Sequence, residues 1–102
     1  MTKARTLLAE YVSNGSDAAF RELVGRYVGL VYSTALRRVG GDSHLAEDIA
    51  QTVFVDLARK ARSLSEEVML GGWLHRHTCH VADTVLRGER RRQLRERQSM
   101  DV

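Results

Sequence analysis

The residues with the clearest chemical potential lie between positions 73 and 91. If this stretch forms one helix, a tryptophan, short polar side chains and arginines recur at steps of three and four residues on one side. Arginines attract phosphate without regard to sequence, shorter polar groups reach base edges, and an indole stacks on an unpaired base. The pattern predicts a nucleic-acid-binding surface. Its members are Trp73, Arg76, His80, Thr84, Arg87 and Arg91, with His77 beside them.

A plainer interpretation of these residues stays open at this point. Trp73 would then be an ordinary core residue, and the arginines would serve only to keep the surface hydrated. The stripe favours nucleic-acid binding but leaves this plainer interpretation open.

The same stretch holds three histidines and the only cysteine, Cys79. On a helix, only His77 with His80, or His75 with Cys79, share a face at ligand spacing, and these pairs point in different directions. The fourth histidine, His44, belongs to another predicted helix. We therefore expect no metal and no cofactor. We also find no catalytic triad order, carboxylate pair or phosphate-binding glycine loop, so we expect no enzyme.

Helices must position these side chains, and the places where the sequence would break a helix predict four helices. Proline is absent, and clusters of glycine and serine fall at residues 13–16, 40–43 and 63–72. Ser16 or Asp17 and Asp42 or Ser43 are suitable N-caps. The predicted fold class is all-α, a compact four-helix domain. Its helices cover residues 2–12, 17–39, 43–62 and 72 onward.

The third predicted helix has two distinct faces. Its inner face is apolar at about 100° per residue and predicts core packing for Ala46, Ile49, Ala50, Val53, Leu57 and Ala61. On the opposite side, polar residues frame one valine, as on a surface that docks a partner: Asp48, Gln51, Thr52 and Val55. Spacing alone favours the alternative of a solvated helix back with one stray valine.

Composition limits the class of protein. The chain has 102 residues, of which 43% are hydrophobic and 28% charged, as in a single globular domain. Its longest uncharged stretch is too short to span a bilayer, it has no secretory leader, and one cysteine forms no internal disulfide, so we expect a cytoplasmic protein. Residues 1–86 carry no net charge, whereas residues 87–102 carry the whole excess of +3. The basic end favours an anionic partner.

Two motifs in this chain match a known family. One is the run Ala46-Glu47-Asp48-Ile49-Ala50-Gln51-Thr52-Val53-Phe54, and the other is Trp73-Leu74 with Arg76. From about residue 7 to residue 92, the chain resembles region 2 of bacterial sigma factors, in particular the small extracytoplasmic-function (ECF) group.

This resemblance implies a function for both surfaces. In the family, the outer side of the third helix docks on the clamp-helix coiled coil of the RNA polymerase β′ subunit, and Asp48, Gln51, Thr52 and Val55 match those positions. The fourth helix and the loop before it contact the promoter −10 element, help to melt it, and hold a flipped base of the non-template strand. Residues 63–72 match that loop. Trp73, Arg76, His77, His80 and Thr84 match the helix.

The chain also departs from the family pattern. Glu66 and Glu67 in the loop would repel phosphate, so we expect them to point away from the backbone or to accept from a base. His80 and Thr84 stand where many relatives have asparagine, which alters the expected base preference. We expect residues 1–86 to form the region 2 body and residues 87–102 a basic helix extension that begins the interdomain linker. The family's second domain, which reads the −35 element, is missing, and we expect a truncated piece of a longer factor.

Two other classes of function remain as alternatives. The chain can be a helical protein-interaction module, for example one that binds an anti-sigma factor, without reading a promoter. It can also be a general basic DNA-binding bundle, which would not depend on strand opening. For the sigma factor reading, we expect two opposite-facing surfaces on the four-helix body.

Overall fold

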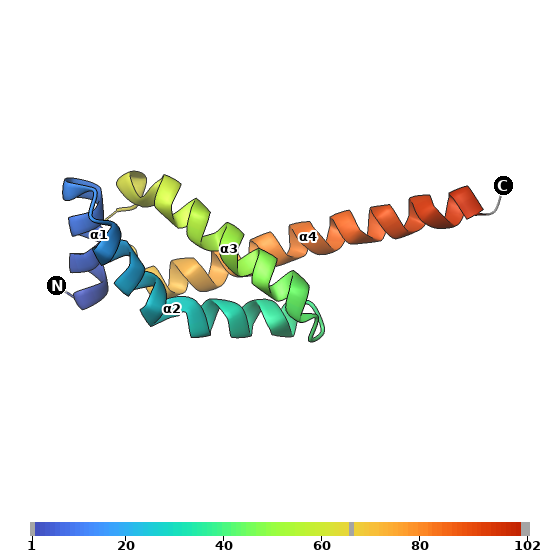
Figure 1. The fold of residues 1–102 in the computed structure, drawn as a ribbon, viewed down its shortest axis with the longest axis horizontal. Coiled ribbons are helices and arrows are strands. Elements are labelled where there is room, and N and C mark those ends of the chain that lie inside the picture. The colour runs from blue at the N-terminus through green and yellow to red at the C-terminus, as the bar shows by residue number, and fades with distance from the viewer. Residues whose placement is uncertain (1, 66, 101–102) are drawn as a thin grey trace.

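The computed structural model describes residues 2–65 and 67–100 and has four α-helices, which confirms the predicted all-α class (Figure 1). The helices are α1 (Lys3–Asn14), α2 (Asp17–Arg38), α3 (Ser43–Lys60) and α4 (Leu70–Met100), with a short 3₁₀ turn, η1 (Ala61–Ser63), after α3. The third helix ends two residues earlier than predicted. The fourth begins two residues earlier than predicted, so Leu70, Gly71 and Gly72 belong to it and not to the preceding loop.

Short polar side chains begin the first three helices, as the sequence predicts for α2 and α3. Ser16 accepts a hydrogen bond from the Ala19 amide at 3.1 Å, and Asp42 accepts one from the Leu45 amide at 3.1 Å. Thr2 does the same for α1. Each bond satisfies a first-turn amide that has no partner within its helix. Gly40 and Gly41, with φ of 64° and 87°, form the left-handed turn after α2, a conformation that costs glycine least.

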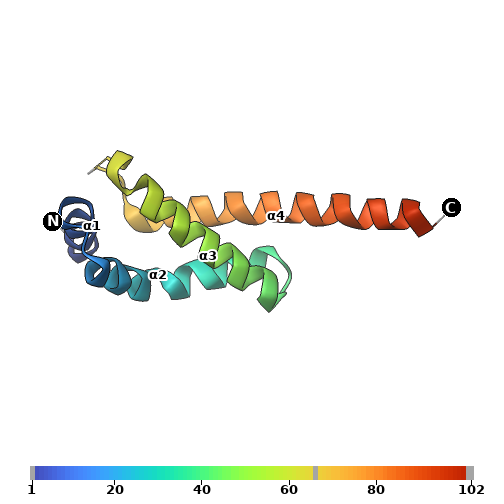
Figure 2. The same cartoon turned by 45° about the horizontal axis from the view of Figure 1, so that its top comes forward.

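The core lies where α2, α3 and α4 pack together, and α1 closes one end of it (Figures 1 and 2). The inner face predicted for α3 is confirmed, because all six of its members are buried. The side chains with no exposed surface come from three helices, and the largest of them are Leu23, Ile49, Leu57, Leu74, Val31 and Val53. Burial of this apolar surface supplies the main stabilisation of the body.

The two halves of α4 differ in their surroundings. From Leu70 to Leu86 the helix is packed against α2 and α3, whereas among residues 87–100 only Glu89 is partly covered. The helix continues unbroken to Met100 and projects well past the body, which gives the molecule its length of 59 Å against 23 and 22 Å (Figure 1). The body is compact as predicted, but the molecule as a whole is elongated.

None of the helices in residues 2–65 and 67–100 combines the length and apolar character needed to cross a membrane.

Candidate nucleic-acid and polymerase interfaces

The outer surface of α3 is solvent-exposed along the line that the sequence predicts. We call Asp48, Gln51, Thr52 and Val55 the α3 face; all four are exposed, and Val55 retains 49% of its surface. The Thr52 hydroxyl donates to the carbonyl of Asp48 at 3.0 Å, which keeps that hydroxyl on its own helix. Directly behind this face, Ile49 and Val53 are fully buried, so the helix is anchored in the core while the face stays exposed to solvent.

The polar side chains predicted on α4 also lie along one accessible side. We call Trp73, Arg76, His77, His80, Thr84, Arg87 and Arg91 the α4 stripe. All are exposed except Trp73 and His77, which are half-buried. The Thr84 hydroxyl donates to the carbonyl of His80 at 3.1 Å and accepts from the Arg87 guanidinium at 3.3 Å. The stripe thus combines free arginines with one arginine whose head is held beside a neighbouring turn.

Trp73 lies at the body end of the stripe with a histidine against one of its faces. Its indole packs partly on the core, and the His77 ring is stacked on it at 4.8 Å between centroids and 13° between planes. His77 in turn has Nε2 at 2.8 Å from Asp56 Oδ2 on α3. The ring is therefore held on two sides, and only 13% of the His77 side chain is exposed. Sequence reasoning missed Asp56, because nothing in its own helix marks it.

The Asp56 contact also shows how the two surfaces are related. Asp56 follows Val55 in the chain and reaches His77 at the edge of the α4 stripe. The α3 face and the α4 stripe therefore adjoin along this edge. That the two surfaces face opposite ways stays a prediction, because the packing of α3 against α4 does not fix the direction of either outer surface.

The loop between η1 and α4 is tied to the first helix. The Arg5 guanidinium of α1 donates to the carbonyl of Ser65 at 2.5 Å, and the amide of Val68 donates to the same carbonyl at 3.1 Å. Glu67 is exposed, whereas Glu66 lies outside the described residues. The loop is shorter than predicted because Leu70 is buried and already belongs to α4. Gly71 packs close to Tyr27, since a Cβ added to this glycine would lie 3.6 Å from the tyrosine ring.

The histidines point toward different neighbours. His75 has Nδ1 at 3.5 Å from the Thr34 hydroxyl on α2 and Nε2 at 3.8 Å from the Cys79 sulfur, while His77 contacts α3. His44 is exposed at the start of α3. Within the described part of the chain, no three histidine, cysteine or acidic side chains come together as metal ligands do.

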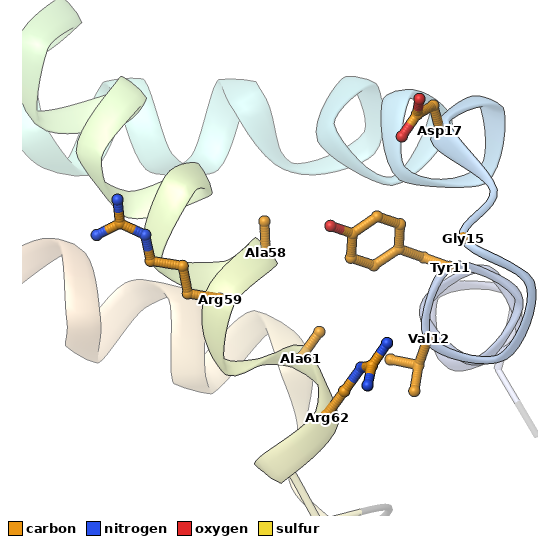
Figure 3. A pocket seen from close by; sticks show the side chains of 8 residues that line it. All are labelled: Tyr11, Val12, Gly15, Asp17, Ala58, Arg59, Ala61 and Arg62. Carbon is orange, nitrogen blue, oxygen red and sulfur yellow. The ribbon is translucent and has the colours of Figure 1, made fainter.

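A hollow of about 260 Å³ lies at the C-terminal end of α3, between that helix and the α1–α2 turn (Figure 3). The Tyr11 ring points into it, and Arg59 and Arg62 flank it. None of the predicted site residues lines it. Small-molecule sites are concave and mostly enclosed, whereas the α3 face and the α4 stripe lie on convex helix surfaces, which suit a macromolecular partner.

The chain is thus a helical domain with an exposed basic stripe on α4 and an exposed face with an apolar centre on α3. In a comparison with known protein families, residues 23–98 match the family model Sigma-70 region 2. The match covers most of the chain, and the chain belongs to this family. Comparison with curated proteins gave no significant match, and neither did comparison with solved structures. The family is one of sigma factor domains that bind RNA polymerase and recognise promoters, and it is not an enzyme family.

Proposed function

We propose that this chain is the region 2 domain of an ECF-group sigma factor that binds the β′ clamp helices of RNA polymerase and recognises and melts the promoter −10 element. The observation that carries the proposal is the side-by-side exposure of the α3 face and the α4 stripe, both within the residues that match the family. The two motifs behind the resemblance contribute to these surfaces, the first with Asp48, Gln51 and Thr52 and the second with Trp73 and Arg76.

The α3 face is proposed to contact the polymerase. Val55 offers an exposed apolar group at its centre, with Asp48, Gln51 and Thr52 around it. Protein interfaces place an apolar contact inside a polar rim, and this arrangement on a well-packed helix fits that pattern. The proposal assigns these four residues to the β′ coiled coil.

The α4 stripe is proposed to hold the non-template strand. Trp73 would stack on an unpaired base, while Arg76, His80 and Thr84 reach base edges or sugar and phosphate oxygens. Unstacking a base costs a few kcal/mol, and stacking plus a pocket for the flipped base offsets that cost. Binding energy alone would then open the strands, without any chemical step in this domain.

The projecting part of α4 is proposed to follow the phosphate backbone. Arg87 and Arg91 continue the stripe beyond the body, and Arg95 falls on the same side one turn later. Residues 1–86 would form the region 2 body, and residues 87–102 the basic extension that begins the linker.

The proposal is tested by selecting single-stranded oligonucleotides that bind the protein, once with the wild type and once with His80→Asn. We expect a defined preferred sequence for the wild type and a changed preference at a single position for the variant, because the two side chains differ in donors and acceptors. His44→Asn is the matched control, since His44 is exposed and lies outside both surfaces. Failure to enrich any sequence, or equal binding of any duplex, would contradict promoter reading.

A further inference from the structure

His77 occupies an unusual place in the α4 stripe. It lies one turn after Trp73 and is covered from two directions, by the indole and by Asp56. Since only 13% of its side chain is exposed, it has little surface left for a direct contact with DNA. Its position instead suits His77 to support the neighbouring Trp73.

The contact with Asp56 fixes the orientation of the His77 ring. A carboxylate only accepts hydrogen bonds, so Nε2 must carry the hydrogen that joins the two groups at 2.8 Å. This bond determines the direction of the Nε2 side of the ring and, with the helix, the plane of the imidazole. The nearly parallel indole, 13° away, then packs against a surface whose position is set from α3.

We propose that Asp56 is a positioning residue for promoter recognition, which orients Trp73 through His77. The inference rests on the proposed function, in which Trp73 stacks on a base. An aromatic side chain held in its binding orientation before the ligand arrives loses less conformational entropy on binding. Asp56 belongs to neither predicted surface; it lies on α3 next to the α3 face and supports the α4 stripe across the helix boundary.

This proposal differs from a purely structural role for the pair. A structural pair would change the free energy of unfolding and leave the surroundings of the indole in the folded protein as they are. A positioning pair changes the mobility of the indole in the folded protein and the affinity for unpaired bases together. The two roles are therefore separable by measurement.

Trp73 is the only tryptophan in the chain, so intrinsic fluorescence reports on this one ring without a label. We expect Asp56→Ala to raise acrylamide quenching and lower the emission anisotropy of the free protein. Asp56→Asn keeps an oxygen that accepts from Nε2 and should restore both signals. Glu47→Ala, which removes an exposed carboxylate from the same helix, is the matched control and should leave both unchanged.

The second arm measures binding of a selected single-stranded oligonucleotide. We expect Asp56→Ala to weaken it about two- to tenfold, as for loss of one ordered side chain, with an unchanged salt dependence because no phosphate contact is removed. In a Trp73→Ala background the same change should have no further effect on affinity.

Unchanged quenching and anisotropy in folded Asp56→Ala would overturn the proposal. So would a loss of affinity that merely follows the unfolded fraction seen by circular dichroism. If Trp73→Ala itself leaves oligonucleotide binding intact, the proposed function of the stripe fails, and the fluorescence arm still decides whether Asp56 orients the indole.

Discussion

The α3 face and the α4 stripe are neighbouring surfaces, yet they are organised differently. On the α3 face the side chains stand exposed, and the Thr52 hydroxyl donates to the backbone carbonyl of Asp48 one turn earlier in the same helix. On the α4 stripe, side chains hold one another: His77 stacks on Trp73 and reaches Asp56, and Thr84 holds Arg87. The side chains of the α3 face thus stand apart, whereas several side chains of the α4 stripe contact one another or a neighbouring helix.

The two surfaces also differ in charge. The α3 face carries one acid and no base, whereas the α4 stripe carries three arginines and no acid. Electrostatic complementarity governs partner choice and encounter rates more than it governs affinity. In the proposed function the two surfaces bind different partners, so each should respond to its own substitutions only.

The largest effect is expected from reversing the character of the α3 face. Asp48→Arg with Val55→Glu should weaken binding to the β′ coiled coil at least about 100-fold, since a charge then replaces the apolar centre of the contact. Oligonucleotide binding should remain within about twofold of the wild type. Surface plasmon resonance with both ligands measures this, with Glu22→Arg on α2 as a charge-reversal control. Intact β′ binding with loss of a different protein partner would favour an interaction module of another kind.

The next largest effect is expected at the indole. Trp73→Ala should weaken binding of a single-stranded −10 oligonucleotide about tenfold or more, because stacking on an aromatic ring contributes about 1–3 kcal/mol per base. Binding to the β′ coiled coil should stay the same, and so should the weak binding to duplex DNA. Fluorescence anisotropy of labelled oligonucleotides is the appropriate measurement. A variant that binds single strands as well as the wild type would show that the ring has no base to hold.

A smaller and different effect is expected from the projecting arginines. Arg87→Gln with Arg91→Gln should weaken binding to all oligonucleotides about equally and lower the slope of log K against log salt by about 0.7 for each lost phosphate contact. The base preference should not change. Arg21→Gln with Arg26→Gln, two exposed arginines of α2, is the matched control. An unchanged slope would remove Arg87 and Arg91 from the interface.

The smallest effect is expected on α2, which carries neither surface. Gly25 and Gly29 are exposed inside this helix, and an added Cβ at either position meets nothing within 4 Å. Alanine at both should raise the free energy of unfolding by up to about 1 kcal/mol each, because glycine loses more backbone freedom in a helix. Thermal unfolding followed by circular dichroism measures this gain. A change in either binding reaction would show that function is not confined to the two surfaces.

Much of this arrangement could be predicted from sequence because it depends on one helix at a time. The helical period places five core residues of α3, and Ala61 of the following turn, on the buried side and the outer face in solvent, and the period of α4 aligns Trp73 with Arg76 and His80. The N-caps of α2 and α3 follow from local chemistry in the same way.

The rest depends on contacts between distant segments, which the periodicity of a single helix does not encode. Asp56 and His77 are 21 residues apart, and Arg5 and Ser65 are 60 apart. Only the packing of the helices brings these pairs together. The early start of α4 also depends on packing. Gly71 and Gly72 suggested a loop, but Leu70 before them is buried against the body, and the helix therefore begins at Leu70.

The most direct test of two adjoining surfaces with separate partners is amide chemical-shift mapping of the labelled protein. With a selected single-stranded oligonucleotide, we expect the largest shifts at Trp73, Arg76, His80 and Thr84, including the one indole N–H signal. With the β′ coiled coil, we expect them at Asp48, Gln51, Thr52 and Val55. Shifts from both ligands on one shared set of residues, or an indole signal that ignores the oligonucleotide, would contradict this account.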